Sequence, residues 1–274
     1  MMPFIVVISL KSSHERRQRI SVHLHGLGLE FEFFDAVDGD DADTLVNSFV
    51  TRSDFFAPSY TFRSESISNR ELACTISHMR AISHVWSTKR AAPVLVLEDD
   101  AILLAADASL IEAVFSKLPA DACYLQLALT PAGLIGVLAE SYHIGGDMLV
   151  AKSGCCAVEL GGNIIGCHSA GAYLLTEKGM RQIAELWFEG DRCIFPCGHE
   201  QLNNNVALVA DRLVYHAATS GGGRGYVCSF PMATTTALDS TLHPAHVPWH
   251  SEARDMAYKW SNILRSRILS SLNV

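Results

Sequence analysis

Residues 93–104 read PVLVLEDDAILL, and this stretch decides the fold. Pro93 precedes four apolar residues, a pattern that predicts a short strand buried on both faces, as in a parallel sheet covered by helices. Three acidic residues, Glu98, Asp99 and Asp100, follow this strand at once. Ligands of open α/β sheets bind outside the carboxyl ends of the strands, so the sequence predicts an acidic site at that edge.

The acidic triplet has a chemistry of its own. Side chains alternate along an extended chain, so we expect Glu98 and Asp100 to face one way and Asp99 the other. Two converging carboxylates suit Mg²⁺ or Mn²⁺, which bind through one or two carboxylates plus substrate phosphates. The alternative is that three acids after a strand merely solvate a turn.

The N-terminal stretch predicts a βαβ unit. Residues 4–10 (FIVVISL) are almost wholly apolar and indicate a strand. Ser12 and Glu15 have the spacing of a capping box that opens a helix, which ends at Gly28. Residues 31–37 (FEFFDAV) then return as a strand.

Further elements follow the same patterns. Ser68 and Glu71 form a second capping-box spacing, which opens a helix that ends near Lys89. Thr176 is the predicted N-cap of a later helix. The remaining expectations are helices over 107–118 and 178–188, strands over 123–129 and 170–175, irregular structure over 40–68, and short strands and loops over 133–166. Together they predict an α/β fold with a Rossmann-like, mostly parallel central sheet and flanking helices.

The C-terminal residues 251–274 read as an amphipathic basic helix. Apolar residues recur at helical spacing, and Lys259, Arg265 and Arg267 accompany them. Such a helix either docks on the core or lies on an anionic membrane surface, which would make the protein a peripheral membrane protein.

Composition narrows the function. The 274 residues carry a net charge of -8, which argues against nucleic-acid binding through a basic surface. The first ten residues lack the basic region of a signal peptide, and no apolar stretch reaches about 18 residues, so we expect a cytoplasmic protein.

The eight cysteines lack a paired framework and indicate reduced, mostly buried thiols. Two groups resemble half of a zinc site, Cys193 and Cys197 with His199, and Cys74 with His78. Neither has a second half at the spacing that four ligands require.

Four stretches of the chain resemble glycosyltransferase family 25. They are 6–20 (VVISLKSSHERRQRI), 31–39 (FEFFDAVDG), 68–104 with its SNRELACTISHMRAISHVW and APVLVLEDDAILL segments, and 166–183 (GCHSAGAYLLTEKGMRQI). The resemblance covers roughly residues 4–185, and the combination is far more specific than any single stretch.

The resemblance implies a GT-A type fold and a bacterial enzyme that builds lipopolysaccharide or lipooligosaccharide, often by transferring galactose from UDP-galactose to a saccharide or lipid-linked saccharide acceptor. It implies one catalytic domain over 1–250, with a donor-binding half over 1–130 and an acceptor-side half over 131–250. The expected donor-binding residues are Ser9, Arg16, Asp38, Glu71, His78, Glu98 and Asp99, and the expected ligands of Mn²⁺ or Mg²⁺ are Glu98, Asp100 and His243.

Several of these residues also have a purely structural interpretation. Glu71 is then the acid of a capping box, and His78 a core histidine satisfied by a hydrogen bond. Arg16 is a solvated helix residue, and Asp38 shapes a turn.

The acceptor half departs from the family pattern. The family shows Pro followed two residues later by Asp, whereas residues 195–200 read FPCGHE, with Gly198 at the acidic position. Transfer with inversion needs a base, for which Glu200 is the first candidate and Asp191 and His199 are weaker ones. Solvation of a loop is the alternative for each. Glycine-rich residues 221–225 predict a mobile, substrate-ordered lid that carries Arg224.

Two other functions are compatible with the sequence. One is a metal-dependent phosphotransferase or nucleotidyltransferase, which also uses carboxylates at a strand end. The other is a non-catalytic saccharide-binding or adaptor protein on the same fold.

Overall fold

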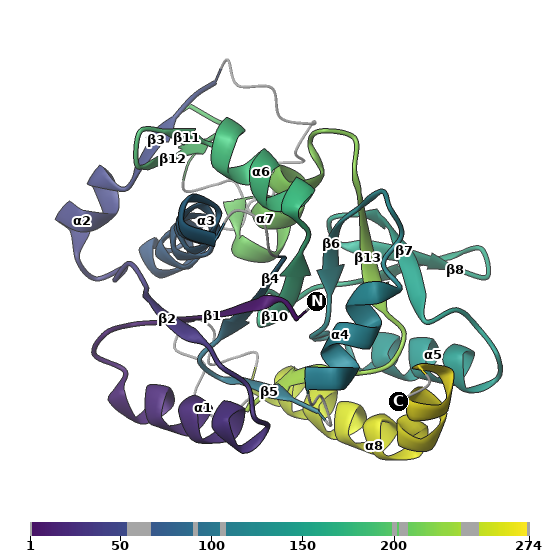
Figure 1. Ribbon diagram of the computed structural model, residues 1–274. Coiled ribbons are helices and arrows are strands. Elements are labelled where there is room, and N and C mark those ends of the chain that lie inside the picture. The colour runs from purple at the N-terminus through teal and green to yellow at the C-terminus, as the bar shows by residue number, and fades with distance from the viewer. Residues whose placement is uncertain are drawn as a thin grey trace.

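The central sheet of this computed structural model has nine strands, in the order β2-β1-β4-β10-β6-β13-β7-β8-β9 (Figure 1). The structure describes residues 2–53, 67–89, 93–104, 108–198, 202, 208–236 and 247–272. The strands are β1 (Phe4–Ser9), β2 (Glu32–Asp35), β4 (Val94–Glu98), β6 (Ala122–Gln126), β7 (Leu149–Gly154), β8 (Ala157–Leu160), β9 (Asn163–Gly166), β10 (Ala172–Leu175) and β13 (Arg224–Cys228).

The sheet is mixed. β2, β1 and β4 pair in parallel, as do β6 and β13, whereas β10, β7, β8 and β9 pair in antiparallel fashion with their neighbours. The predicted α/β class is confirmed, but the sheet is not mostly parallel, because β10 enters between β4 and β6 in the opposite direction. The carboxyl ends of β1, β4 and β6 therefore lie at one edge, beside the start of β10.

Helices cover both faces of the sheet, as Figure 1 shows. One face carries α3 (Asn69–Lys89), α6 (Glu177–Leu186) and α7 (Ala210–Thr219), and the other carries α1 (His14–Gly26), α4 (Ala108–Ser116), α5 (Ala132–His143) and α8 (Val247–Leu272). Successive residues of β4 face opposite sides of the sheet. Val94 and Val96 pack in the core beneath α3, α6 and α7, and Leu95 and Leu97 pack in the core on the other face. The strand β4 is buried on both faces, as its sequence predicts.

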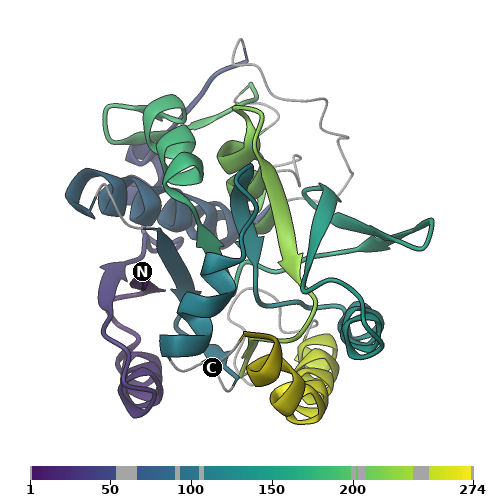
Figure 2. The same ribbon diagram turned by 45° about the vertical axis from the view of Figure 1, so that its right-hand side comes forward.

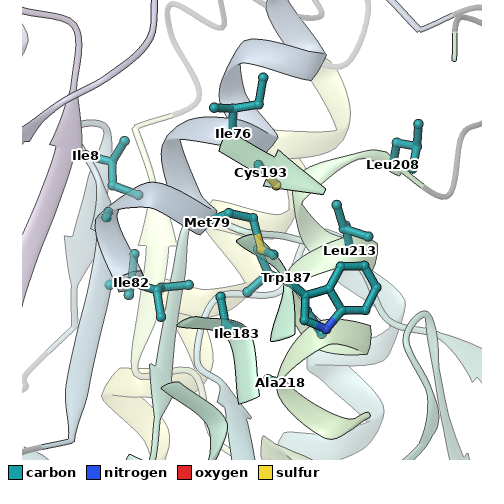
Figure 3. Close-up of a cluster of buried hydrophobic side chains, with 14 of the residues drawn as sticks. Ile8, Ile76, Met79, Ile82, Ile183, Trp187, Cys193, Leu208, Leu213 and Ala218 are labelled. Atoms are coloured by element: carbon teal, nitrogen blue, oxygen red, sulfur yellow. The ribbon is translucent and has the colours of Figure 1, made fainter. Parts of the chain in front are cut away.

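The first core lies between α3, α6 and α7 (Figure 3). Ile76, Met79 and Ile82 lie on one stripe of α3 and are fully buried. Ile183 of α6 and Leu213 of α7 belong to the same cluster. This packing fixes α3, and with it the side chains that α3 presents to the end of β4.

Two of the three predicted helix caps are confirmed. Glu71 accepts hydrogen bonds from the backbone N–H and hydroxyl of Ser68, at 2.7 and 2.8 Å, and Thr176 accepts one from the N–H of Gly179. The predicted Ser12 cap is wrong, since α1 begins after Ser13, which makes no side-chain cap bond.

The stretch 40–68, predicted as irregular, contains regular elements, and the stretch 133–166 contains the predicted short strands β7, β8 and β9 but also a helix that was not predicted. Residues 40–68 include α2 (Ala42–Asn47) and β3 (Phe49–Thr51), and β3 pairs with β12 (Arg192–Phe195), which pairs with β11 (Phe188–Glu189). Residues 133–166 hold most of α5, a helix without a side-chain cap and with Gly133 and Gly136 inside it. Its pattern therefore lacked the usual start signal.

The C-terminal helix α8 lies beside α5, as both views show (Figure 2). Ala253, Ala257 and Leu264 are buried, which agrees with a helix docked on the core. The helix begins at Val247, before the predicted residue 251. Among the described residues, no helix is both long and apolar enough to cross a membrane. Membrane contact through α8 stays a prediction.

All eight cysteines are free thiols, as predicted. Five of them, Cys123, Cys167, Cys193, Cys197 and Cys228, are buried, and the other three are half-buried.

Candidate active site

The acidic triplet lies at the shared carboxyl edge of β1 and β4. Ser9 ends β1 and Glu98 ends β4, and the two strands pair in parallel. The N–H of Glu98 donates to the carbonyl of Gly171, just before β10. Residues from both halves of the chain therefore hold the position of Glu98.

Glu98 faces α3. The Nε2 atom of His78 lies 3.1 Å from Oε1 of Glu98, and Nδ1 of His78 lies 2.8 Å from the hydroxyl of Tyr173. Burial opposes ionisation, but the hydrogen bond from His78 and the charges of His78 and Arg16 outweigh it, so the pKa of Glu98 lies below its ordinary value. The Glu98 side chain is 28% exposed and can reach a ligand.

Asp99 faces the opposite way, as alternation predicts. It accepts a 2.6 Å hydrogen bond from the hydroxyl of Ser9 and pairs with Arg16 at 2.5 Å. Its side chain is only 7% exposed, and burial raises its pKa although Arg16 and Ser9 favour the charged form. Asp99 therefore supports the loop from inside.

Two predicted donor-binding residues, Ser9 and Arg16, serve this same support. Ser9 is buried behind Asp99, not in an open cleft. Arg16 is engaged with Asp99, and its side chain is 18% exposed. Neither engagement was visible in the sequence, because 83 residues or more separate these partners along the chain.

Asp100 does not follow the predicted alternation. The strand ends at Glu98, and Asp99 and Asp100 form a turn before β5 (Ala101–Leu103), which pairs with β14 (Ala233–Thr235). One carboxylate oxygen of Asp100 lies 3.8 Å from Arg16. The carbonyl of Asp100 accepts from the N–H of Thr236, which ties this turn to the second half of the chain.

Cys74 and His78 lie one turn apart on α3, and both face Glu98. One ligand atom from each of Cys74, His78 and Glu98 lies within 4.8 Å of the others. Burial raises the pKa of the Cys74 thiol well above its ordinary value, and the charges of Glu98, Asp211, Asp100 and Glu71 raise it further. Carboxylates from β4, the following turn, α3 and α7 thus act on one thiol.

Two other predicted donor-binding residues have local structural partners. Glu71 is the acid of the capping box at the start of α3. Asp38 accepts from the N–H of Asp40 and so shapes the turn after β2, and Asp40 pairs with Arg70 at the start of α3. The structural interpretations of Glu71 and Asp38 agree with these contacts.

Of the three predicted bases, Asp191 alone lies among the described residues. Asp191 lies in the exposed turn between β11 and β12, in a separate small sheet. Glu200 and His199, as well as the predicted metal ligand His243, lie outside the described residues. Their roles stay predictions.

Asp211 is a candidate that the sequence analysis missed. It lies in the first turn of α7, its side chain is 19% exposed, and its Oδ2 lies 3.8 Å from Nδ1 of His168. The hydroxyl of Thr75 donates to the carbonyl of Leu208 at 2.7 Å and joins the start of α7 to α3, directly beside Cys74. The sequence signal for Asp211 is an acidic residue in the first turn of a helix, but the helix α7 itself was not predicted.

The glycine-rich segment does not form the predicted lid. Arg224 begins β13, which pairs with the start of β6 and so lies at the edge opposite Glu98. A Cβ on Gly223 would lie 1.9 Å from the sulfur of buried Cys123. These glycines permit close packing, and Arg224 pairs with Asp121 at 3.5 Å.

Fold and site together define an α/β protein with an acidic site at the carboxyl edge of its central sheet. Residues 2–133 match the model of glycosyltransferase family 25, described as LPS biosynthesis protein. This part of the chain carries the acidic triplet, and the predicted resemblance to that family is confirmed over these residues. The resembling stretch 166–183 lies outside the match.

Solved structures add two similarities. A structure of the inositol-1-phosphate CTP transferase from T. maritima is 13% identical, with a TM-score of 0.40, over 93% of this chain and 97% of that one. Mouse xyloside xylosyltransferase 1, in its apo form, is 12% identical, with a TM-score of 0.39, over 80% and 82% of the two chains. No match was found among curated proteins.

Proposed function

We propose that this family 25 glycosyltransferase transfers a hexose, with galactose the first to test, from a UDP-sugar to a saccharide acceptor in lipopolysaccharide or lipooligosaccharide assembly. The observation that carries the proposal is the difference in environment between Asp99 and Glu98 of the acidic triplet. Asp99 is buried on Ser9 and Arg16, whereas Glu98 stays partly exposed at the sheet edge. On a GT-A type fold this edge receives the nucleotide-sugar donor.

The residues at this edge fit a hard divalent cation. Glu98 and Asp100 offer carboxylate oxygens, the ligands that Mg²⁺ and Mn²⁺ prefer, and neither acid is exposed enough to be a mere surface charge. When bound, such an ion would stabilise the negative charge that develops on the departing diphosphate. Arg16, within 3.8 Å of Asp100, places a fixed positive charge at the same edge.

We propose Asp211 as the base on the acceptor side. In a direct displacement the acceptor oxygen bonds to the anomeric carbon, the bond from that carbon to the UDP oxygen breaks, and the hydroxyl proton passes to the base. Asp211 is partly exposed, and its charge acts on the same thiol as that of Glu98. Glu200, Asp191 and His199 are the alternatives that the sequence offers.

The test is a UDP-release screen across several UDP-sugars, with truncated lipooligosaccharides as acceptors, with and without Mn²⁺. We expect release that depends on both acceptor and divalent metal, and sugar attached to the acceptor by mass spectrometry. Release of UDP from no donor with any acceptor would refute the proposal. A nucleotide or phosphate on the product would instead assign the chain to the nucleotidyl- or phosphotransferases.

A further inference from the structure

The strongest unassigned feature is the cluster of Cys74, His78 and Glu98. Cys74 and His78 are four residues apart on α3, so they lie on one face of the helix. Glu98 comes from the end of β4 and supplies the third group that the sequence did not place beside them. Ligand atoms from all three residues lie within 4.8 Å of one another.

The spacing suits a tetrahedral metal ion. Bonds of about 2.0 Å from zinc to nitrogen and oxygen place two ligand atoms about 3.3 Å apart in tetrahedral geometry. Nε2 of His78 and Oε1 of Glu98 are already 3.1 Å apart. His78 and Glu98 therefore already have the spacing that an ion requires, and the sulfur of Cys74, which lies within 4.8 Å of both ligand atoms, would move closer to complete the site.

A buried partner holds the histidine in the orientation that ligation needs. The hydroxyl of Tyr173 lies 2.8 Å from Nδ1 of His78, and the Tyr173 ring stacks on that of Tyr124, 5.3 Å between centroids. Without a metal, Nε2–H of His78 donates to Glu98; on binding an ion His78 would give up this proton and donate Nδ1–H to Tyr173 instead, which leaves the lone pair of Nε2 for the ion. Metal-binding histidines in proteins are fixed in the same way through their other ring nitrogen.

The ligand set selects the kind of ion. Thiolate and imidazole ligands suit zinc and similar transition metals, whereas Mg²⁺ and Mn²⁺ prefer oxygen. Four carboxylates, Glu98, Asp211, Asp100 and Glu71, act electrostatically on Cys74 and make this position attractive to a dication. The Glu98 side chain is 28% exposed, so solvent reaches the cluster on the side of Glu98.

We propose that Cys74, His78 and Glu98 form a binding site for a thiophilic divalent cation such as Zn²⁺. This site differs from the proposed donor-metal site, which uses only the oxygens of Glu98 and Asp100. Both sites need Glu98, so an ion bound to Cys74, His78 and Glu98 would prevent Glu98 from binding the donor metal. If the proposal holds, the chain binds Zn²⁺ in the absence of a sugar donor.

The test titrates Co²⁺, a spectroscopic substitute for Zn²⁺, into the full chain after chelator treatment and under a phosphine reductant. We expect one Co²⁺ per chain, a thiolate-to-cobalt charge-transfer band in the near ultraviolet, visible bands of tetrahedral intensity, and loss of all of them on adding Zn²⁺. Cys74→Ser should abolish the charge-transfer band. No band in the wild-type chain, or a band that survives Cys74→Ser, overturns the proposal.

Two further variants make the result specific. The sulfur atoms of Cys155 and Cys156 lie 3.3 Å apart and could themselves bind the probe, so the double variant Cys155→Ser, Cys156→Ser must keep the band. Its loss there would move the site away from α3 and refute the assignment.

Glu98→Gln should weaken Co²⁺ binding at least tenfold while keeping the band at saturation, because the thiolate stays in place. Unchanged affinity would remove Glu98 from the site. This variant also keeps the test decisive if Cys74→Ser does not fold. The readout uses no sugar donor, so its failure leaves the proposed hexosyltransferase activity untouched.

Discussion

Nε2 of His78 lies 3.1 Å from Oε1 of Glu98, although the residues are 20 positions apart and belong to different elements. The contact joins the buried face of α3 to the partly exposed end of β4. Within the triplet, Glu98 is therefore the residue that a buried side chain orients and that solvent still reaches.

Glu98→Gln should lower kcat for UDP-sugar transfer about 10²-fold or more, the size of effect seen when one electrostatic contact to a transition state is lost. The amide keeps a hydrogen-bonding oxygen toward His78, so the fold should persist. Steady-state kinetics and thermal unfolding check this. Glu30→Gln, in an exposed loop before β2, is the matched control and should behave as wild type. Equal activity of the two variants would contradict the role given to Glu98.

Asp211→Asn should lower kcat by about 10²- to 10⁴-fold, the range for loss of a general base, while leaving the affinity for UDP unchanged. Calorimetric binding of UDP separates the two effects. Asp191→Asn, in the exposed turn between β11 and β12, is the comparison. If only Asp191→Asn lost activity, the assignment of the base would be reversed.

Asp99→Ala should reduce the free energy of unfolding by about 3 kcal/mol, because Arg16 loses the partner of a largely buried ion pair. Ser9 loses its short hydrogen bond at the same time. Urea unfolding measures the change. Asp147→Ala, at an exposed position before β7, should stay within about 0.5 kcal/mol of wild type. A change that small for Asp99→Ala would show that the pair contributes little.

Several elements could be predicted from local patterns. The strand β4, the triplet after it, the Ser68 cap and the Thr176 cap are written in residues that lie close together in the chain. Predictions failed where the partner is distant in sequence. The contacts of Ser9 and Arg16 with Asp99, and the position of Glu98 beside Cys74 and His78, depend on how β1, α1, α3 and β4 come together.

The helices α5 and α7 were harder to predict for a different reason. α5 has no side-chain cap and contains glycines, and α7 is preceded by Val209, which cannot cap a helix through its side chain. Without α7, the position of Asp211 could not be recognised. The glycines at 221–225 suggested motion, whereas Gly223 and Gly225 make room for Cys123 and Tyr215.

Gly223→Ala should destabilise the fold by about 1–3 kcal/mol, since the new methyl group meets the buried sulfur of Cys123. Adding Cys123→Ala should recover part of this loss, because it removes that sulfur. Gly133→Ala, in α5 with open space around it, should instead stabilise by about 0.5 kcal/mol. Chemical denaturation compares the variants. A neutral Gly223→Ala would favour the lid that the sequence suggested.

His23 predicts a pH dependence of stability. Its Nε2 accepts a 2.9 Å hydrogen bond from the N–H of Leu103, and burial lowers its pKa below the ordinary 6.5. The unfolded chain therefore binds the proton more readily, so the stabilising contribution is complete above pH 6.5 and declines as the pH falls through the lowered pKa. Unfolding free energies at pH 7.5 and 5.5 should differ less in His23→Gln, whose side-chain oxygen can accept the same bond, than in wild type. The exposed His14→Gln should leave the difference unchanged, and an equal effect of both variants would exclude His23 as the cause.

The position of β10 between β4 and β6 has a consequence for how the chain folds. Emerging from the ribosome, the segment that matches the glycosyltransferase family ends at residue 133, before β10 exists. Until β10 is synthesised, β4 and β6 each expose an unpaired edge, and the carbonyl of Gly171 that holds Glu98 is missing. The matched segment therefore lacks the strand that completes its sheet, and a truncation near residue 133 should yield aggregation-prone material instead of a folded domain.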